Sequence, residues 1–389
     1  MTLAESCLLI VDCPHTTARD EGAGYPLVRT PNVGFGRLVY DGMHRVSEEV
    51  YNCRNKRAVP SPGDLIYARE APAGNVAVIE PGEKVCLGQR TVLLRPNPRI
   101  VDSYYLAYYL LSPEHRNELV GQASGATVLH VNLADIRSLK VSFPKIDVQR
   151  RIVAVINDYY SAIDNARRQI ALLEEAAMRL YREWFVVNAD PKWEKRRLWD
   201  VCDYFRGVSY TSKEIEGKNG VPLITLKNIE RFGGFREDRS KTFSGVCKEG
   251  SSAGANDILM AVTDMTKERR LVGHVAMVPD TYDDAQFSMD LIRLKGKLVS
   301  DSFLYAMLRY STYADEFAVR ASGANVLHLK PSSLDDCEVV VPKRVLREKF
   351  DSTFVPIVQK KNALYRAILR LTEARDRLLP KLMSGEIEV

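Results

Sequence analysis

An eight-residue segment of this 389-residue chain occurs twice with a single difference. Ala-Ser-Gly-Ala-Thr-Val-Leu-His at 123–130 returns as Ala-Ser-Gly-Ala-Asn-Val-Leu-His at 321–328, and further matches follow at the same offset as far as 173–180 and 371–378. A repeat of about half the chain is much longer than the roughly 20–50 residues of a solenoid repeat. The sequence therefore predicts two similar units joined in tandem.

Each half contains short β-branched runs and one helical segment, which together predict a mixed α/β (α+β) domain. In the first half, strands are expected at 76–79 and 91–94, and a helix at 104–119 that is interrupted before Pro113. The second half repeats this order less closely. Its segments at 222–224, 257–259 and 301–303 resemble those at 26–28, 64–66 and 102–104.

A long amphipathic helix is predicted after each domain, because apolar residues recur in alternating steps of four and three. Lys361 and Arg375 interrupt the second series, and Pro356 is expected to kink that helix or delay its start. Asn188 and Pro191 are expected to end the first helix. We call the line of apolar residues along which the two helices would pair the seam. Its predicted positions are Ile152, Ile156, Ile163, Ile170, Leu173, Leu180, Phe354, Ile357, Leu364, Ile368, Leu371 and Leu378.

The order domain, helix, domain, helix requires two paired helices to run antiparallel. About 40 residues at 1.5 Å each give a coiled-coil spacer of roughly 60 Å. We therefore expect a pseudo-twofold tandem repeat. Its segments are a first domain at 1–146, a first spacer helix at 147–187, a second domain at 188–342 and a second spacer helix at 343–389.

Charge and cysteine content exclude some classes of protein. The net charge is +5, but the excess lies in the last segment, where residues 343–389 carry 11 Lys or Arg against 6 Asp or Glu. Neither domain is basic, so net charge alone does not predict nucleic-acid binding. The seven scattered cysteines contain no Cys-x-x-Cys pair, which predicts reduced thiols in a cytoplasmic protein and no metal site. No segment has the roughly 20 apolar residues of a membrane helix, and no secretion signal is recognised.

Local clusters of Arg, Lys, Asn and Gln on turn-rich segments are more informative, because these side chains read base edges in the major groove. The alternative is that they are ordinary solvated loop surface. The candidate DNA-binding residues are Arg29, Asn32, Arg54, Lys56, Arg57, Arg69, Gln89, Arg90, Lys227, Asn228, Lys267, Arg269 and Arg270.

No catalytic motif was found. The chain lacks the phosphate loop G-x-x-x-x-G-K-[ST], the Asp/Asn-Pro-Pro-aromatic run of amino-methyltransferases and a G-x-S-x-G nucleophile turn. The acidic run at 335–338 is interpreted as a solvated turn. His130 and His328 occupy matching places in the repeat and are interpreted as scaffold, and Gly125 and Gly323 as residues of a tight turn.

These features together resemble the specificity subunit of type I restriction-modification systems. The resemblance covers essentially the whole chain and is sharpest in Val-Ser-Phe-Pro at 141–144, Val-Val-Val-Pro at 339–342 and Arg-Leu-Leu-Pro-Lys-Leu-Met-Ser-Gly-Glu-Ile at 377–387. Asp-Cys-Pro-His-Thr-Thr at 12–17 also resembles the opening of some first lobes. The start Trp-x-x-x-x-Leu, common in the family, is present for the second domain at 193–198 and absent from the first.

The resemblance implies a non-catalytic subunit with two target-recognition domains, each of which reads one half of an asymmetric, bipartite site in double-stranded DNA. The spacer helices would set the gap and dock two methyltransferase subunits, with restriction/translocase subunits outside them. S-adenosylmethionine, ATP and Mg²⁺ would then belong to the partners, and this chain would hold no cofactor. Two alternatives are an enzyme in its own right and a coiled-coil scaffold without sequence-specific DNA contact.

Overall fold

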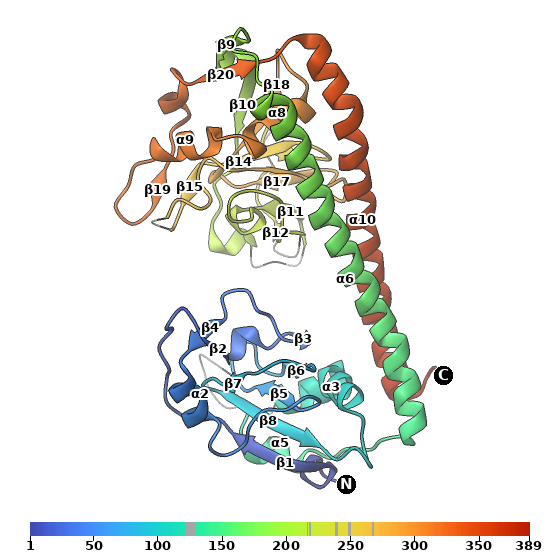
Figure 1. The fold of residues 1–389 in the computed structure, drawn as a ribbon. Helices are drawn as coiled ribbons and strands as arrows, with labels where there is room; N and C mark the ends of the chain where they lie inside the picture. Colours follow the sequence, from blue (N-terminus) through green and yellow to red (C-terminus); the bar gives the residue numbers. More distant parts are fainter. Residues whose placement is uncertain (122–128, 216, 218, 238–239, 248–249, 267) are drawn as a thin grey trace. The chain divides into compact units, whose positions relative to one another are not determined.

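The computed structural model describes residues 1–121, 129–215, 217, 219–237, 240–247, 250–266 and 268–389. The chain forms two compact units. The first contains Met1–Ala162 together with Leu371–Val389, and the second contains Ile163–Arg370. We use "lobe one" for residues 1–146 and "lobe two" for residues 188–342. Each unit thus consists of one lobe and a segment of both long helices (Figure 1).

Lobe one is a mixed α/β domain. Its main sheet has the order β1-β8-β5-β6-β3, and a smaller sheet has the order β4-β2-β7. Helix α3 packs against β6 and β3 of the main sheet. The elements are α1 (Leu3–Ser6), β1 (Cys7–Asp12), β2 (Tyr25–Val28), η1 (Thr30–Asn32), β3 (Phe35–Gly36), β4 (His44–Val46), α2 (Glu48–Arg54), β5 (Leu65–Ala68), β6 (Val76–Val78), β7 (Cys86–Leu87), β8 (Thr91–Pro96), α3 (Ser103–Leu111), α4 (Pro113–Gly121) and α5 (Leu133–Ser138).

Lobe two repeats this plan. Its main sheet has the order β10-β18-β14-β16, and its second sheet has the order β12-β11-β17-β13. The elements are β9 (Glu194–Arg197), α7 (Leu198–Val201), β10 (Cys202–Arg206), η3 (Ser212–Ile215), β11 (Val221–Ile224), η4 (Leu226–Asn228), β12 (Lys241–Phe243), β13 (Ser252–Ala253), β14 (Ile258–Ala261), β15 (Thr263–Asp264), β16 (Val275–Met277), β17 (Ala285–Phe287), β18 (Leu291–Gly296), α8 (Asp301–Tyr310), α9 (Tyr313–Val319), β19 (Leu327–His328), η6 (Pro331–Leu334) and β20 (Glu338–Val341).

The strand registers show that the two lobes are built on one scaffold. Ala68 of β5 lies opposite Thr91 of β8, and Ala261 of β14 lies opposite Leu291 of β18. The lobes also begin alike, because the amide of Leu3 donates to the carbonyl of residue 139 and the amide of Leu198 donates to that of residue 337. Lobe one therefore has the same start as lobe two, although it lacks the Trp that marks this start in sequence.

The two long helices are continuous. Helix α6 spans Ile146–Arg182 and passes into a π-helical turn, Glu183–Val187, which Asn188 ends as expected. Helix α10 spans Arg344–Ser384, so Pro356 lies inside the helix and does not delay its start. Pro113 interrupts the helical segment of lobe one, as expected, because α3 ends at Leu111 and α4 starts at Pro113.

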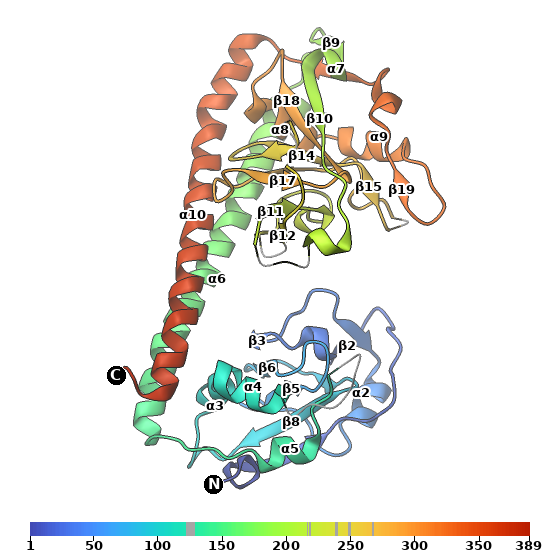
Figure 2. The ribbon, with the colours of Figure 1, turned by 180° about the vertical axis from the view of Figure 1, so that it is seen from behind.

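Within each unit, the segments of α6 and α10 lie side by side and run antiparallel (Figures 1 and 2). In the first unit, Ile152 and Ile156 from the start of α6 share a core with Leu379 and Leu382 from the end of α10. In the second unit, Tyr181 near the end of α6 contacts Phe350 near the start of α10. All twelve predicted seam positions are buried or half-buried.

The two charged residues that interrupt the seam both have partners. Lys361 makes an ion pair with Glu174 of α6, and that carboxylate also accepts a hydrogen bond from Tyr310 of α8 at 2.9 Å. Arg375 lies over the ring of Tyr160 at 4.7 Å, a cation–π contact. The interruptions are therefore specific polar contacts between the helices and the lobes, and the apolar seam continues on either side of them.

Polar contacts also fix each lobe on its helix segments. In the first unit, the Tyr108 hydroxyl donates to Asn157 Oδ1 at 2.6 Å, and the Tyr160 hydroxyl donates to the carbonyl of Phe35. In the second unit, the Asn362 amide of α10 donates to Asn256 Oδ1 at 2.9 Å. Among the described residues, no helix has the length and apolar character needed to cross a membrane.

We predict that lobe one depends on the C-terminal end of the chain. Leu382 is 2% exposed in the core of the first unit, so Leu382→Ala should lower the free energy of unfolding by about 2–5 kcal/mol. Leu369 is on the same helix and 57% exposed, and Leu369→Ala should have little effect. Denaturant unfolding of the two full-length variants checks this, and equal losses of stability would contradict the shared core.

The Glu174 ion pair predicts a pH dependence of stability. Burial alone would raise the pKa of the Glu174 carboxyl, but the Lys361 ammonium and the Arg309 guanidinium outweigh burial and hold the pKa below its ordinary value. A carboxyl with a lowered pKa in the fold stabilises the fold above its unfolded pKa, and this contribution is lost as the pH falls through the folded pKa.

We therefore expect Glu174→Gln to unfold at a lower denaturant concentration than the wild type at pH 7. The difference should shrink as the pH falls below the ordinary glutamate pKa of about 4.3 and through the lower pKa of the folded carboxyl, where the wild type also takes up a proton. The neighbouring exposed Glu175, which pairs with Arg179 four residues along the helix, provides the control variant Glu175→Gln. A gap for Glu174→Gln that is independent of pH would contradict the ion-pair explanation.

Candidate nucleic-acid interface

Charged side chains gather where three strands of the lobe-one sheet end together. Strand β1 ends at Asp12, β5 is followed by Arg69 and Glu70, and β8 is preceded by Arg90. The amide of Arg69 donates to the carbonyl of Arg90 at 3.0 Å, which holds the last two segments side by side. We call Asp12, Arg69, Glu70, Arg90 and His130 the sheet-end cluster.

The side chains of the sheet-end cluster form one continuous chain of contacts. Arg69 Nη1 lies 3.0 Å from Asp12 Oδ1, and Arg69 Nη2 lies 2.6 Å from His130 Nε2. His130 Nδ1 lies 2.7 Å from Glu70 Oε1, which is 3.3 Å from Arg90 Nε. Because a guanidinium only donates, Nε2 of His130 must accept and Nδ1 must carry the proton that it donates to Glu70. The contacts therefore fix the tautomer of His130.

The segment after β1 is tied to the same end of the sheet. The Gln89 amide donates to the carbonyl of His15 at 3.2 Å and its oxygen accepts from the Thr17 hydroxyl at 3.0 Å. Arg54 donates to the carbonyls of Leu87 and Thr16. His15 itself lies 3.2 Å from Asp12 Oδ2, and its side chain is 62% exposed. His15 and Arg90 are thus the exposed ends of the contact network.

Four predicted DNA-binding residues are buried inside the lobes, which corrects their interpretation as base-reading side chains. Arg54 and Arg69 are each 6% exposed, and their guanidinium groups donate the hydrogen bonds to neighbouring groups of lobe one that are given above. Asn32 is 1% exposed and caps its own turn, where its Oδ1 accepts from the amide of Arg29. Asn228 is fully buried and does the same for Thr225 in lobe two. Their polar groups satisfy buried backbone groups, which sequence alone does not reveal.

The remaining DNA-binding candidates of lobe one lie at the surface and differ in how much of each side chain is exposed. Lys56 and Arg57 are exposed, and Arg57 also contacts the carbonyl of Asp12 at 3.3 Å. Arg29 is half-buried, and its Nη2 donates to the carbonyl of Gly42 at 3.0 Å. Gln89 is half-buried, whereas 43% of the Arg90 side chain is exposed.

In lobe two, Lys227 is exposed, Arg269 and Arg270 are half-buried, and Lys267 lies outside the described residues. Asp264 shapes the loop that carries them, because its carboxylate accepts from the amides of Thr266, Leu271 and Val272. Burial alone would raise the pKa of Asp264, but a hydrogen bond from the Thr266 hydroxyl and these amide hydrogen bonds hold it below its ordinary value.

The repeated segment has different roles in the two lobes. Gly323 adopts φ 147°, and a Cβ there would lie 1.9 Å from the carbonyl oxygen of Val326, so this turn requires glycine as predicted. Gly125 lies outside the described residues. His130 belongs to the sheet-end cluster, whereas His328 is exposed and pairs through its backbone with Thr263. The two histidines therefore share a position in the repeat but not an environment.

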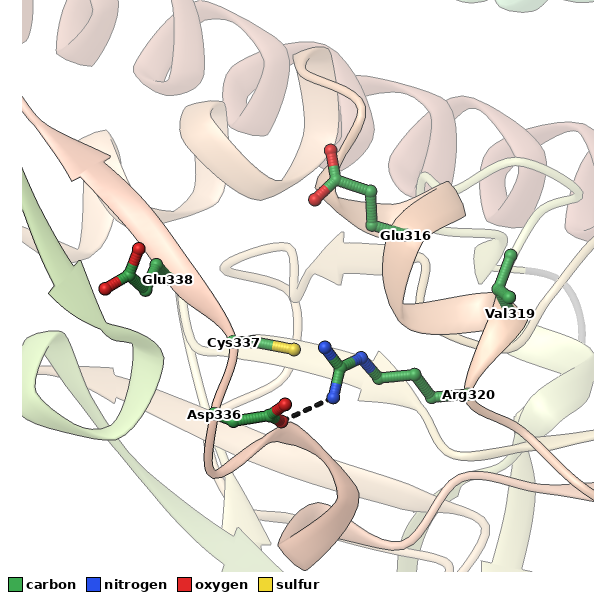
Figure 3. Close-up of a pocket in the computed structure, with 6 residues that line it drawn as sticks. All are labelled: Glu316, Val319, Arg320, Asp336, Cys337 and Glu338. Atoms are coloured by element: carbon green, nitrogen blue, oxygen red, sulfur yellow. Dashed lines mark hydrogen bonds and ion pairs between the residues drawn. The ribbon is translucent and has the colours of Figure 1, made fainter.

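The acidic run at 335–338 borders an open hollow in lobe two (Figure 3). Figure 3 shows the Arg320 guanidinium directed at Asp336, with which it makes an ion pair. Glu316 and Glu338 add two further carboxylates to the rim. This charge balance disfavours DNA phosphates. Within the described ranges, no group of three or more His, Cys, Asp or Glu side chains is placed to hold a metal ion.

Sequence reasoning missed Asp12, His15, Glu70 and His130 as members of the candidate interface. The missing signal is spatial, because these residues come from three segments that only the sheet brings together. The matched registers also reveal that lobe two keeps only the histidine of the cluster, as His328. At the other matched positions, Arg206 replaces Asp12, Val262 replaces Arg69 and Thr263 replaces Glu70. Before the following strand, Met289 replaces Gln89 and Asp290 replaces Arg90.

Comparisons with known proteins agree with these features. A family model described as a type I restriction modification DNA specificity domain matches residues 12–175. The MjaIX specificity subunit of Methanocaldococcus jannaschii is 24% identical over 381 residues, which cover 90% of this chain and 83% of the relative. The HindI specificity subunit of Haemophilus influenzae is 20% identical, with 85% and 88% covered.

The fold has been seen in a solved structure. The type I restriction-modification S subunit from M. genitalium aligns with a TM-score of 0.52 and 15% identity, covering 98% of this chain and 95% of that one. The chain is thus similar to the type I restriction modification DNA specificity domain over residues 12–175 and to type I specificity subunits over most of its length. The resemblance to these subunits that the sequence predicted is confirmed.

The burial of Arg69 reverses what sequence alone suggests for this residue. A surface reader could be removed without loss of stability, but Arg69→Ala leaves Asp12 without its main countercharge. We expect the free energy of unfolding to fall by roughly 3 kcal/mol. Lys56→Ala removes an exposed cation from the same lobe and should change stability by less than about 0.5 kcal/mol. Urea unfolding of both variants decides between the two roles.

Proposed function

We propose that this chain is the DNA sequence-specificity subunit of a type I restriction-modification complex and that it binds an asymmetric, bipartite site in double-stranded DNA. In this role each lobe reads one half of the site, and the chain itself is non-catalytic. The similarity to the specificity domain supports the general role. The observation that carries the asymmetry is the contrast between the two lobes at matched positions of one scaffold.

That contrast is chemical. Lobe one presents the half-exposed guanidinium of Arg90 before β8, and the matching position before β18 in lobe two carries Asp290. A guanidinium donates hydrogen bonds to the acceptors of guanine, whereas a carboxylate accepts them from the amino group of cytosine. Lobes that differ in this way are suited to different half-sites.

The partners follow from the same role. We propose that the chain assembles with methyltransferase subunits, two in the simplest pseudo-twofold arrangement, and that restriction/translocase subunits join the complex. S-adenosylmethionine, ATP and Mg²⁺ would be bound by those partners. The relatives named above are described as specificity subunits of type I restriction enzymes, which supports an assembly of this kind.

The first test is methylome sequencing of host cells with and without this gene. We expect one bipartite motif to lose its methylation when the gene is deleted, with two half-sites of different sequence. A palindromic motif would contradict the asymmetry argued from the lobes.

Deletion could leave the methylome unchanged, or the complex with its methyltransferase could show no sequence-dependent DNA binding. Either result would favour the alternative role as a coiled-coil scaffold. Methylation or cleavage of DNA by the purified chain alone would instead show an enzyme.

A further inference from the structure

Lobe two folds the same sheet without the sheet-end cluster, so the fold does not require that cluster. Strands β10, β18, β14 and β16 have the order and registers of β1, β8, β5 and β6. Yet four of the five cluster residues, Asp12, Arg69, Glu70 and Arg90, are replaced at the matched positions of lobe two, and only His130 is repeated, as His328. A network that is absent from one of two similar scaffolds is available for a function specific to the other.

The backbone of Arg90 is strained. Its φ is 66°, in the left-handed region that is favourable for glycine and unfavourable for other residues. Non-glycine residues held in this region occur preferentially at functional sites, where the surrounding structure over-determines them. Here the Arg90 carbonyl accepts from the amide of Arg69, and its side chain contacts Glu70. An arginine is thus kept where glycine would be less strained.

The contacts orient the Arg90 guanidinium and leave part of it unused. Glu70 approaches Arg90 from the Nε side, and 43% of the Arg90 side chain is exposed. The edge formed by the two terminal amino groups therefore faces away from this contact. Two parallel N–H donors match the O6 and N7 acceptors of guanine in the major groove, the commonest specific contact of arginine with DNA.

We propose that Arg90 reads a guanine in the half-site of lobe one, and that Asp12, Arg69, His130 and Glu70 position it. This inference rests on the proposed function. In it, Arg90 touches the base, and the other four act only through Arg90. Glu70 is the last positioning residue, because it contacts both His130 Nδ1 and Arg90 Nε.

The test is the methylation motif and the DNA-binding preference of the full-length chain in complex with its methyltransferase subunit from the same host. Three variants address Arg90 and Glu70: Arg90→Gly, Arg90→Lys and Glu70→Gln. The control is Arg99→Ala, because Arg99 is an exposed arginine that follows the opposite end of β8. It removes the same charge from the same lobe.

Arg90→Gly should lower discrimination for one guanine of the lobe-one half-site by roughly 5- to 150-fold, the range of one bidentate base contact. Its midpoint of unfolding should be unchanged or higher, because glycine tolerates φ 66°. Arg90→Lys should lose the same discrimination, since an ammonium lacks the planar fork. Glu70→Gln should lower the discrimination for guanine at the same position of the half-site, but by less than Arg90→Gly does. The lobe-two half-site and the Arg99→Ala motif should stay as in the wild type.

Two results overturn the inference while the proposed function stands. One is an unchanged guanine preference in Arg90→Gly. The other is full retention of that preference in Arg90→Lys, which would make Arg90 only a positive charge near a phosphate. If instead the wild-type complex shows no sequence-dependent binding, the proposed function itself fails, and that outcome is read from the wild type before any variant is compared.

Discussion

Each lobe of this protein is completed by side chains from both long helices, and much of the structure follows from that requirement. Helices α6 and α10 each carry an apolar stripe that must be buried. In the first unit the stripe is covered by lobe one, where Leu379 and Leu382 pack in the same core as Leu3. In the second unit Phe350 and Phe354 enter the core of lobe two. The helices are therefore parts of the cores as well as connections.

The charged positions of the seam give the pairing its specificity. An apolar stripe alone tolerates slippage along the helix, whereas Lys361 must meet Glu174 to avoid an unpaired buried charge. Arg375 pairs with the adjacent Asp376 and adds a cation–π contact with Tyr160 of α6. Contacts of this kind fix the register of α6 against α10 within each unit. Lys361 and Arg375 are visible in the sequence as interruptions, but their contacts on α6 lie far away along the chain and become apparent only in the fold.

The sequence predicted the parts of the fold that depend on local pattern and on the repeat. The two mixed α/β lobes, the long helices, the break before Pro113 and the helix end at Asn188 all follow from periodicity, proline and capping chemistry. The resemblance to type I specificity subunits came from motifs spread over the whole chain. Of the two outcomes predicted for Pro356, a kink or a delayed start, its place inside α10 excludes the delayed start.

The candidate site was less predictable, because residue type does not tell whether a side chain faces solvent or a set of buried carbonyls. Arg54 and Asn32 looked like DNA contacts and are internal ties. Arg90 kept its predicted place at the surface, but its positioning by Glu70 required the sheet. The two lobes share one scaffold, so the residues that only one lobe carries stand out as candidates for reading DNA.

The central claim is that the sheets are a common scaffold and that the residues at their ends choose the DNA. It is tested most directly by giving lobe one the residues of lobe two at five matched positions. The substitutions are Asp12→Arg, Arg69→Val, Glu70→Thr, Gln89→Met and Arg90→Asp, made together so that no buried charge loses its partner alone. Methylome sequencing should then show a changed lobe-one half-site beside an unchanged lobe-two half-site. An unchanged motif in a folded, active complex would contradict the account.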